Sequence, residues 1–124
     1  MSTKSRIAYE EASGKIRSIY CHYDGYLRHN GQILFDYYNK DNIEELLDLG
    51  DLSVLDKSPD LCKAYGRDWG ESDTEALEFN SLKEYADWIG SDYVDFSYLL
   101  KQDGKWYYWE WDYFENIKEV PEIN

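Results

Sequence analysis

Cys21, His22 and Asp24 are the residue types of a cysteine-based catalytic site, in which an imidazole accepts the thiol proton and a carboxylate orients the imidazole. On a strand, however, neighbouring side chains point to opposite faces, so Cys21 and His22 are wrongly spaced for a catalytic dyad. His22 and Asp24 share a face, but they lack a nucleophile unless the fold brings Cys62 or Tyr65 near. We therefore expect Cys21 to pack in the core, His22 and Asp24 to hydrogen-bond the turn, and the protein not to be an enzyme.

The carboxylates of Asp68, Glu71, Asp73 and Glu75 could supply oxygen ligands to a calcium ion. Their spacing lacks the glycine and the terminal glutamate of an EF-hand loop. A zinc site would need an unusual long-range arrangement of two histidines and two separated cysteines, and no glycine-rich phosphate-binding loop is present. The sequence therefore predicts a solvated acidic loop, without a metal site or a cofactor.

Charge is distributed unevenly along the 124 residues, whose net charge is −13. Residues 1–40 carry six Lys or Arg and four Asp or Glu, a net charge of +2, whereas residues 41–124 carry seven and 22, a net charge of −15. Such a chain repels nucleic acid and anionic membranes and is attracted to basic surfaces, many of which bind nucleic acid in other proteins. The expected partner is therefore a basic host protein, such as a nuclease or a DNA-binding effector, and neither nucleic acid itself nor a membrane.

The predicted partner-binding surface combines carboxylates with tryptophans of an aromatic run near the C-terminus. An antiparallel hairpin has two faces, and the alternation of residues 106–111 makes both faces aromatic. An exposed aromatic face would anchor a protein partner, while a second layer or the mate in a homodimer could equally cover it. The predicted residues are Asp68, Glu71, Asp73, Glu75, Glu78, Glu84, Asp87, Asp92, Asp95, Trp109 and Trp111.

The elements that must position these residues follow from periodicity and turn chemistry. Asp103-Gly104 between two apolar runs is a strong hairpin signal, and Asp41 with Glu44 and Ser81 with Glu84 have capping-box spacing. The expected elements are hairpins of residues 6–10 with 15–23 and 93–100 with 105–111, a strand at 77–79, and helices at 28–39, 41–50 and 81–90. Residues 51–73 are expected to be irregular apart from an extended piece at 61–65, and residues 112–124 to form a short helix before Pro121.

These elements predict an α+β fold, with one compact domain over residues 1–124 and an antiparallel sheet of four to five strands covered by three helices. The chain has five Trp, thirteen Tyr and four Phe, which are enough to build a core. We therefore expect a folded chain, because disordered acidic chains lack such aromatic residues. No apolar run is long enough to span a bilayer, and the basic start has no apolar segment of a secretory signal behind it. We expect a cytoplasmic protein whose two cysteines are buried thiols.

The motif Ile-Tyr-Cys-His-Tyr-Asp-Gly-Tyr at residues 19–26 is the most distinctive segment of the chain. Together with Gly-Gln-Ile-Leu at 31–34, Leu-Gly-Asp-Leu-Ser at 49–53, Tyr-Gly-Arg-Asp at 65–68 and Asp-Gly-Lys-Trp-Tyr at 103–107, it resembles a group of small bacteriophage and prophage proteins without an assigned activity. The resemblance implies a genomic context, that of dispensable phage genes, which often modify the host or block its defences.

Two functions are compatible with these features. The first is a phage-encoded inhibitor of a host defence system, of the anti-CRISPR or anti-restriction type, whose acidic face imitates DNA and occupies a basic surface; duplex DNA carries about one charge per 1.7 Å of its axis. An acidic surface also keeps proteins soluble without any partner. The second is capture of a nucleotide-like signal molecule in an aromatic and arginine-containing pocket. Its residues would be His22, Tyr23, Asp24, Tyr26 and Arg28.

Overall fold

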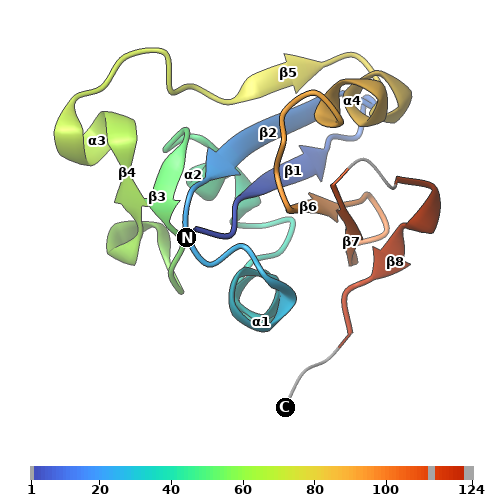
Figure 1. Ribbon diagram of the computed structural model, residues 1–124, viewed down its shortest axis with the longest axis horizontal. Helices are drawn as coiled ribbons and strands as arrows, with labels where there is room; N and C mark the ends of the chain where they lie inside the picture. The colour runs from blue at the N-terminus through green and yellow to red at the C-terminus, as the bar shows by residue number, and fades with distance from the viewer. Residues whose placement is uncertain (1, 112–113, 122–124) are drawn as a thin grey trace.

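The computed structural model describes residues 2–111 and 114–121, in which eight strands form one mixed sheet and four α-helices flank it (Figure 1). The strands are β1 (Ser5–Glu10), β2 (Ile16–Cys21), β3 (Leu52–Val54), β4 (Lys63–Ala64), β5 (Leu77–Phe79), β6 (Phe96–Leu100), β7 (Trp106–Glu110) and β8 (Lys118–Glu119). The α-helices are α1 (Gln32–Tyr37), α2 (Ile43–Leu47), α3 (Tyr65–Trp69) and α4 (Leu82–Ile89). The strand order is β4-β3-β2-β1-β6-β7-β8, and β5 pairs with β2 beside this path.

Strand β1 lies in the middle of the sheet. It pairs antiparallel with β2, where Ile7 is opposite Ile19, and parallel with β6, where Ile7 is opposite Tyr98. A second parallel pair joins β2 to β3 at Cys21 and Leu52. The predicted α+β class is confirmed, but the prediction of an antiparallel sheet of four to five strands with three helices is wrong. The two predicted hairpins are present, and they meet through the parallel β1–β6 pair, which no local sequence signal specifies.

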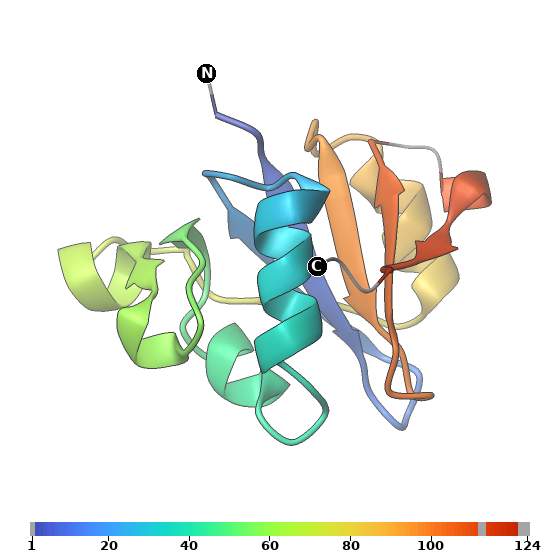
Figure 2. The ribbon, with the colours of Figure 1, turned by 90° about the horizontal axis from the view of Figure 1, so that it is seen from below.

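One face of the sheet is covered by α1 and α2. Alternate residues of β1 and β2, such as Ile7 and Ile19, point to this face and pack with Leu34 of α1 and with Leu46 and Leu47 of α2. A π-helical turn (Leu27–Gly31) leads directly into α1, so both belong to one helical segment, which lies in front of the sheet in Figure 2. This segment confirms the helix predicted at residues 28–39.

The opposite face of the sheet is covered by α4. Ala8 and Leu99 point to this face and pack with Tyr85 and Ile89 of the helix. The predicted cap of this helix is confirmed, because Ser81 Oγ accepts a hydrogen bond from the backbone N–H of Glu84 at 3.1 Å. The cap predicted for α2 is displaced by one residue, since Asn42 rather than Asp41 precedes the first helical residue.

Residues 51–73 are more regular than predicted. The extended piece expected near residues 61–65 is present as β4, but β3, a 3-10 turn (Pro59–Leu61) and α3 were not predicted. These elements are two to five residues long, which is too short for a hydrophobic period to be recognised. In the predicted C-terminal helix, residues 114–116 form a 3-10 turn (Phe114–Asn116) followed by β8, while residues 112–113 and 122–124 lie outside the described residues.

No helix in the described ranges is both long and apolar enough to cross a bilayer.

Candidate functional site

An open pocket of about 950 Å³ lies between the end of α2, strand β2 and the segment that connects α3 to β5. This segment and β5, which follows it, run along the upper edge of Figure 1 from α3 towards α4. Carboxylates outnumber guanidinium groups in the wall of the pocket, which we call the acidic pocket. Its charged lining residues are Glu11, Asp48, Glu71, Glu75, Glu78, Arg17 and Arg67. Three of these carboxylates, Glu71, Glu75 and Glu78, belong to the predicted partner-binding set.

The segment that connects α3 to β5, residues 70–76, is called the acidic segment below, and close contact between Thr74 and a glycine holds it against the body of the protein. The carbonyl oxygen of Thr74 accepts a hydrogen bond from Asp51 N at 2.7 Å. Gly50, with φ of +76°, approaches the same carbonyl so closely that a Cβ at residue 50 would overlap with it. Gly70, with φ of +68°, ends α3 in the left-handed conformation and turns the chain towards Thr74. The acidic side chains therefore project from a segment whose backbone is held at Thr74 by the hydrogen bond from Asp51 N.

Asp51 connects this segment to the sheet. Its Oδ1 accepts a hydrogen bond from the backbone N–H of Tyr20 at 2.9 Å, and its carbonyl oxygen accepts one from Tyr65 N at 3.1 Å, at the start of α3. Burial raises the pKa of the Asp51 carboxyl, while the Tyr20 N–H and the positive charge of Arg6 act in the opposite direction. Asp51 thus joins three parts of the fold: its carboxylate binds β2, its carbonyl oxygen binds the start of α3, and its N–H binds Thr74 beside the acidic pocket.

Both arginines of the acidic pocket are already engaged in ion pairs. Arg17 lies 3.0 Å from Asp48 and 3.6 Å from Glu44, and Arg67 lies 2.9 Å from Asp68. Within the described residues, the other carboxylates of the pocket form no ion pair; they are Glu11, Glu71, Glu75 and Glu78. The field in this pocket is therefore negative, and a cation entering it would meet carboxylates without displacing an internal partner.

Several of the predicted partner-binding carboxylates have internal roles. Asp68 accepts hydrogen bonds from Arg67 and from Ala64 N, and the Arg67 guanidinium is the main cause that lowers the pKa of this carboxyl to about 2. Asp87 pairs with Lys83 at 2.8 Å along the exposed face of α4. Asp73 and Glu84 are exposed, without an ion pair in the part of the chain that the structure describes. The predicted set is thus divided between solvent-facing and internally paired carboxylates.

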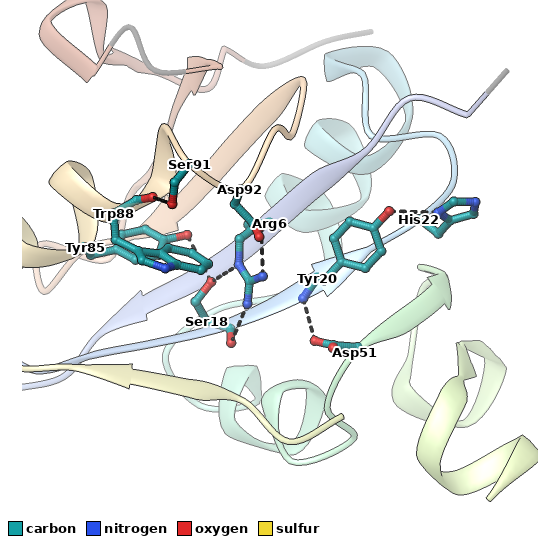
Figure 3. Close-up of polar contacts among 9 residues, drawn as sticks. All are labelled: Arg6, Ser18, Tyr20, His22, Asp51, Tyr85, Trp88, Ser91 and Asp92. Carbon is teal, nitrogen blue, oxygen red and sulfur yellow. Dashed lines mark hydrogen bonds and ion pairs between the residues drawn. The ribbon is translucent and has the colours of Figure 1, made fainter. Parts of the chain in front are cut away.

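Asp92 is the internal partner of Arg6, and Figure 3 shows the guanidinium of Arg6 between Asp92 and Ser18. This contact makes Asp92 a structural residue rather than part of an open surface. Asp95, three residues later, is exposed, and its Oδ2 accepts a hydrogen bond from Lys4 N at 2.9 Å. Asp92 is therefore already paired within the chain, although a quarter of its side chain is exposed, and its role as a partner contact stays a prediction.

The two predicted tryptophans have different environments. Trp109 is 1% exposed and packs against Tyr85 and Phe114, so it belongs to the core beneath α4 and cannot contact a partner in this conformation. Trp111 is 43% exposed at the end of β7. The prediction that both faces of the hairpin are aromatic is correct, but the face that includes Trp109 is covered within the chain, by α4.

The five residues of the alternative ligand site do not form one pocket. His22 packs against Tyr23 with ring centroids 4.5 Å apart, and its Nδ1 hydrogen-bonds the hydroxyl of Tyr20 at 2.8 Å (Figure 3). Asp24, with φ of +58°, occupies the turn after β2, and its carbonyl accepts from Asn30 N. Tyr26 lies just before the π-helical turn and contacts the ring of His29. Arg28 lies within that turn and lines a separate pocket.

Cys21 is the last residue of β2, and the ring of the next residue, His22, hydrogen-bonds Tyr20 and not the Cys21 thiol, as the wrong spacing for a dyad predicted. The thiol of Cys21 is buried in the core beneath α1, where burial raises its pKa to about 11 and Asn30 Nδ2 donates to its sulfur at 3.4 Å. Cys62 is also a buried free thiol. Within the described residues, the hydrogen bonds of the two sulfurs go to backbone atoms and to the side chains of Asn30 and Tyr38, and none goes to an imidazole.

Glu11, Arg17 and Asp48 were not predicted as part of the acidic partner-binding surface. They come from the β1–β2 turn, from β2 and from the end of α2, and only the fold places them beside Glu71 and Glu75. No motif joins these positions in the sequence, because each lies on a different element.

In the described ranges, no group of three or more His, Cys, Asp or Glu residues has a metal-binding arrangement. Comparisons with protein-family models, with curated proteins and with solved structures found no match to this chain.

Proposed function

We propose that the protein is an acidic interaction protein that occupies a basic, nucleic-acid-binding surface of another protein. The observation that carries this proposal is the acidic pocket, in which Glu71, Glu75 and Glu78 lie together and form no ion pair with any other described residue. An arginine or lysine side chain of a partner would find unpaired carboxylates there, in the same way that it finds phosphates on nucleic acid.

The surroundings of the acidic pocket support the same interpretation. Asp73, between α3 and β5, and Glu84, in the first turn of α4, add exposed carboxylates, so negative charge continues beyond the pocket. The connection of Asp51 to Thr74 and Tyr20 fixes the backbone that carries these groups, which lowers the entropy lost on binding. Together with the resemblance to phage proteins, this favours an inhibitor of a host defence nuclease, of the anti-CRISPR or anti-restriction type, acting as a DNA mimic.

The experiment that tests this proposal combines affinity capture with charge reversal. Tagged protein is incubated with bacterial lysate at low and at high salt, and the retained proteins are identified and challenged with duplex DNA. We expect a basic DNA-binding protein that is retained at low salt, lost at high salt and displaced by the DNA. The combined change Glu71→Lys, Glu75→Lys and Glu78→Lys should abolish this retention.

The matched control reverses the same number of charges elsewhere. Asp41, Glu45 and Glu115 are exposed and do not line the acidic pocket. Changing these three to Lys alters the net charge equally, and retention should persist. Equal loss of retention in both triple variants would show that only the overall charge matters. Retention that persists in the presence of duplex DNA and after charge reversal in the acidic pocket would contradict the proposal.

A further inference from the structure

A second pocket, of about 260 Å³, lies on the outer side of α1, and its charge is opposite to that of the acidic pocket. The helical segment contributes a stripe of residues about one turn apart, and the loop after β3 contributes a lysine. The lining residues are Arg28, His29, Gln32, Ile33, Asp36, Tyr37 and Lys57. We call this the basic pocket. It shares no lining residue with the acidic pocket.

Arg28 is unusual among the four arginines of this acidic chain. Arg6, Arg17 and Arg67 each have a carboxylate partner at 3.0 Å or closer. In the described part of the chain Arg28 has no ion pair, although Asp36 lines the same pocket. In a protein with 26 acidic residues, a cation left without a carboxylate is available to an external anion.

Lys57 contacts Tyr37, the last residue of α1, in the lining of the basic pocket. The ammonium nitrogen of Lys57 lies 5.7 Å from the centroid of the Tyr37 ring, a cation–π contact that orients the side chain without neutralising its charge. The backbone beside Lys57 is fixed, because the carbonyl of Asp56 accepts a hydrogen bond from the Tyr38 hydroxyl at 2.8 Å. Lys57 is therefore a positioned cation on a fixed loop.

His29 adds a polar ring whose orientation is set by its neighbour. The side-chain nitrogen of Asn30 donates to Tyr23 O and to Ser5 Oγ, so its Oδ1 is the acceptor that faces His29 Nδ1 at 2.9 Å. Nδ1 of His29 therefore carries a proton and donates to Asn30, which leaves Nε2 as the second polar atom of the ring. A π-helical turn such as the one that holds Arg28 and His29 often marks a functional position.

We propose that the basic pocket binds a small phosphate-bearing ligand of the size of a mononucleotide. Arg28 and Lys57 would contact the phosphate, since guanidinium and ammonium groups are its usual protein partners. Asp36 would accept hydrogen bonds from sugar hydroxyls, and the ring of Tyr37, which is 44% exposed, would contact the base. The volume lies just below the usual range for drug-sized ligands, so a larger molecule would extend into solvent.

This inference does not depend on the proposed function, because the two pockets use different residues. Isothermal titration calorimetry of the whole chain at low salt with AMP, adenosine, ribose 5-phosphate and sulfate tests it directly. We expect saturable binding of AMP, weaker binding of ribose 5-phosphate and sulfate, and none of adenosine. Arg28→Gln and Lys57→Gln should each weaken AMP binding by about tenfold or more, as loss of a charge-assisted hydrogen bond does.

Lys15→Gln is the matched control, since Lys15 is an exposed cation outside the basic pocket and its removal changes the net charge equally. AMP should bind this variant as it binds the wild type. Arg28 and Lys57 are exposed, so their variants should fold, which circular dichroism verifies. Absence of saturable AMP binding, equal affinity for AMP and sulfate, or equal weakening by Lys15→Gln would each overturn the inference.

Discussion

The guanidinium of Arg6 lies 3.0 Å from the carboxylate of Asp92, and this pair joins β1 to the loop that follows α4. The Arg6 side chain is only 5% exposed. Its Nε donates to Ser18 Oγ at 2.8 Å, and the guanidinium carbon lies 5.0 Å from the ring centroid of Trp88 on α4. A buried cation therefore ties the end of α4 to two central strands of the sheet.

Replacing Asp92 by Asn should destabilise the fold strongly. The change leaves the Arg6 charge buried without its counter-ion, for which a loss of about 3 kcal/mol is typical. Urea denaturation at neutral pH measures the free energy of unfolding. Asp87→Asn is the control, because it breaks the exposed pair with Lys83 on the same helix and should change stability little. Similar losses of unfolding free energy in the two variants would show that burial of Arg6 does not make its pair with Asp92 more important for stability than the exposed pair of Asp87.

Gly50→Ala should destabilise the acidic segment more than the loss of a left-handed glycine alone explains. Gly70 is the control, because its φ is also positive and no atom lies within 4 Å of a Cβ placed there. Gly70→Ala should cost about 1 kcal/mol from backbone conformation. Gly50→Ala should cost about 2 kcal/mol more, because the new methyl overlaps with the Thr74 carbonyl. Thermal unfolding of both variants tests this, and equal losses would show that the Thr74 contact has no energetic effect.

Local signals in the sequence predicted most of the longer elements. The hairpins β1–β2 and β6–β7 and the capped helix α4 follow from alternation, from Asp103-Gly104 and from Ser81, all of which act between residues close in sequence. The parallel pairing of β1 with β6 joins residues about 90 apart, and no local pattern specifies it. The short strands β3, β4 and β8 are formed by their neighbours in the sheet rather than by their own propensity.

The candidate site could be predicted only in part, for a related reason. Acidic composition identified Glu71, Glu75 and Glu78, but it could not separate them from Asp92, whose charge is used internally. Which carboxylate meets an arginine depends on tertiary contacts. In the same way Trp109 has the composition of an interface residue but the position of a core residue, because α4 covers its face of the sheet.

Cys21 should resist thiol reagents in the folded protein. Burial raises its pKa to about 11, so almost none is present as the reactive thiolate near pH 8, and the sulfur is also inaccessible. Labelling with iodoacetamide followed by mass spectrometry should modify Cys21 and Cys62 rapidly in urea and very slowly without it. A Ser13→Cys variant gives an exposed reference thiol in the β1–β2 turn. Native labelling of Cys21 as fast as this reference would contradict its burial.

Asp51→Asn should stabilise the protein at neutral pH and have little effect in acid. Because the pKa of Asp51 is raised in the folded state, the folded protein favours the neutral carboxyl. The neutral carboxyl therefore contributes stability at low pH, and this contribution is lost as the pH rises through the pKa of the folded state. Asparagine keeps an oxygen that accepts from Tyr20 N and never ionises. The difference in unfolding free energy between variant and wild type should therefore be small below the unfolded pKa of about 3.9, rise with pH and then level off.

Asp68→Asn should show the opposite dependence on pH, and it serves as the control for Asp51→Asn. The Arg67 guanidinium lowers the pKa of Asp68 to about 2. The ionised Asp68 carboxylate therefore stabilises the folded protein at pH values above the unfolded pKa, and this contribution is lost as the pH falls towards 2. Asp68→Asn should thus be destabilising at neutral pH and nearly neutral in strong acid. Urea denaturation of both variants across this range gives two curves of opposite sign. Curves of the same sign would show that the overall negative charge, rather than the local surroundings of each carboxylate, determines how stability depends on pH.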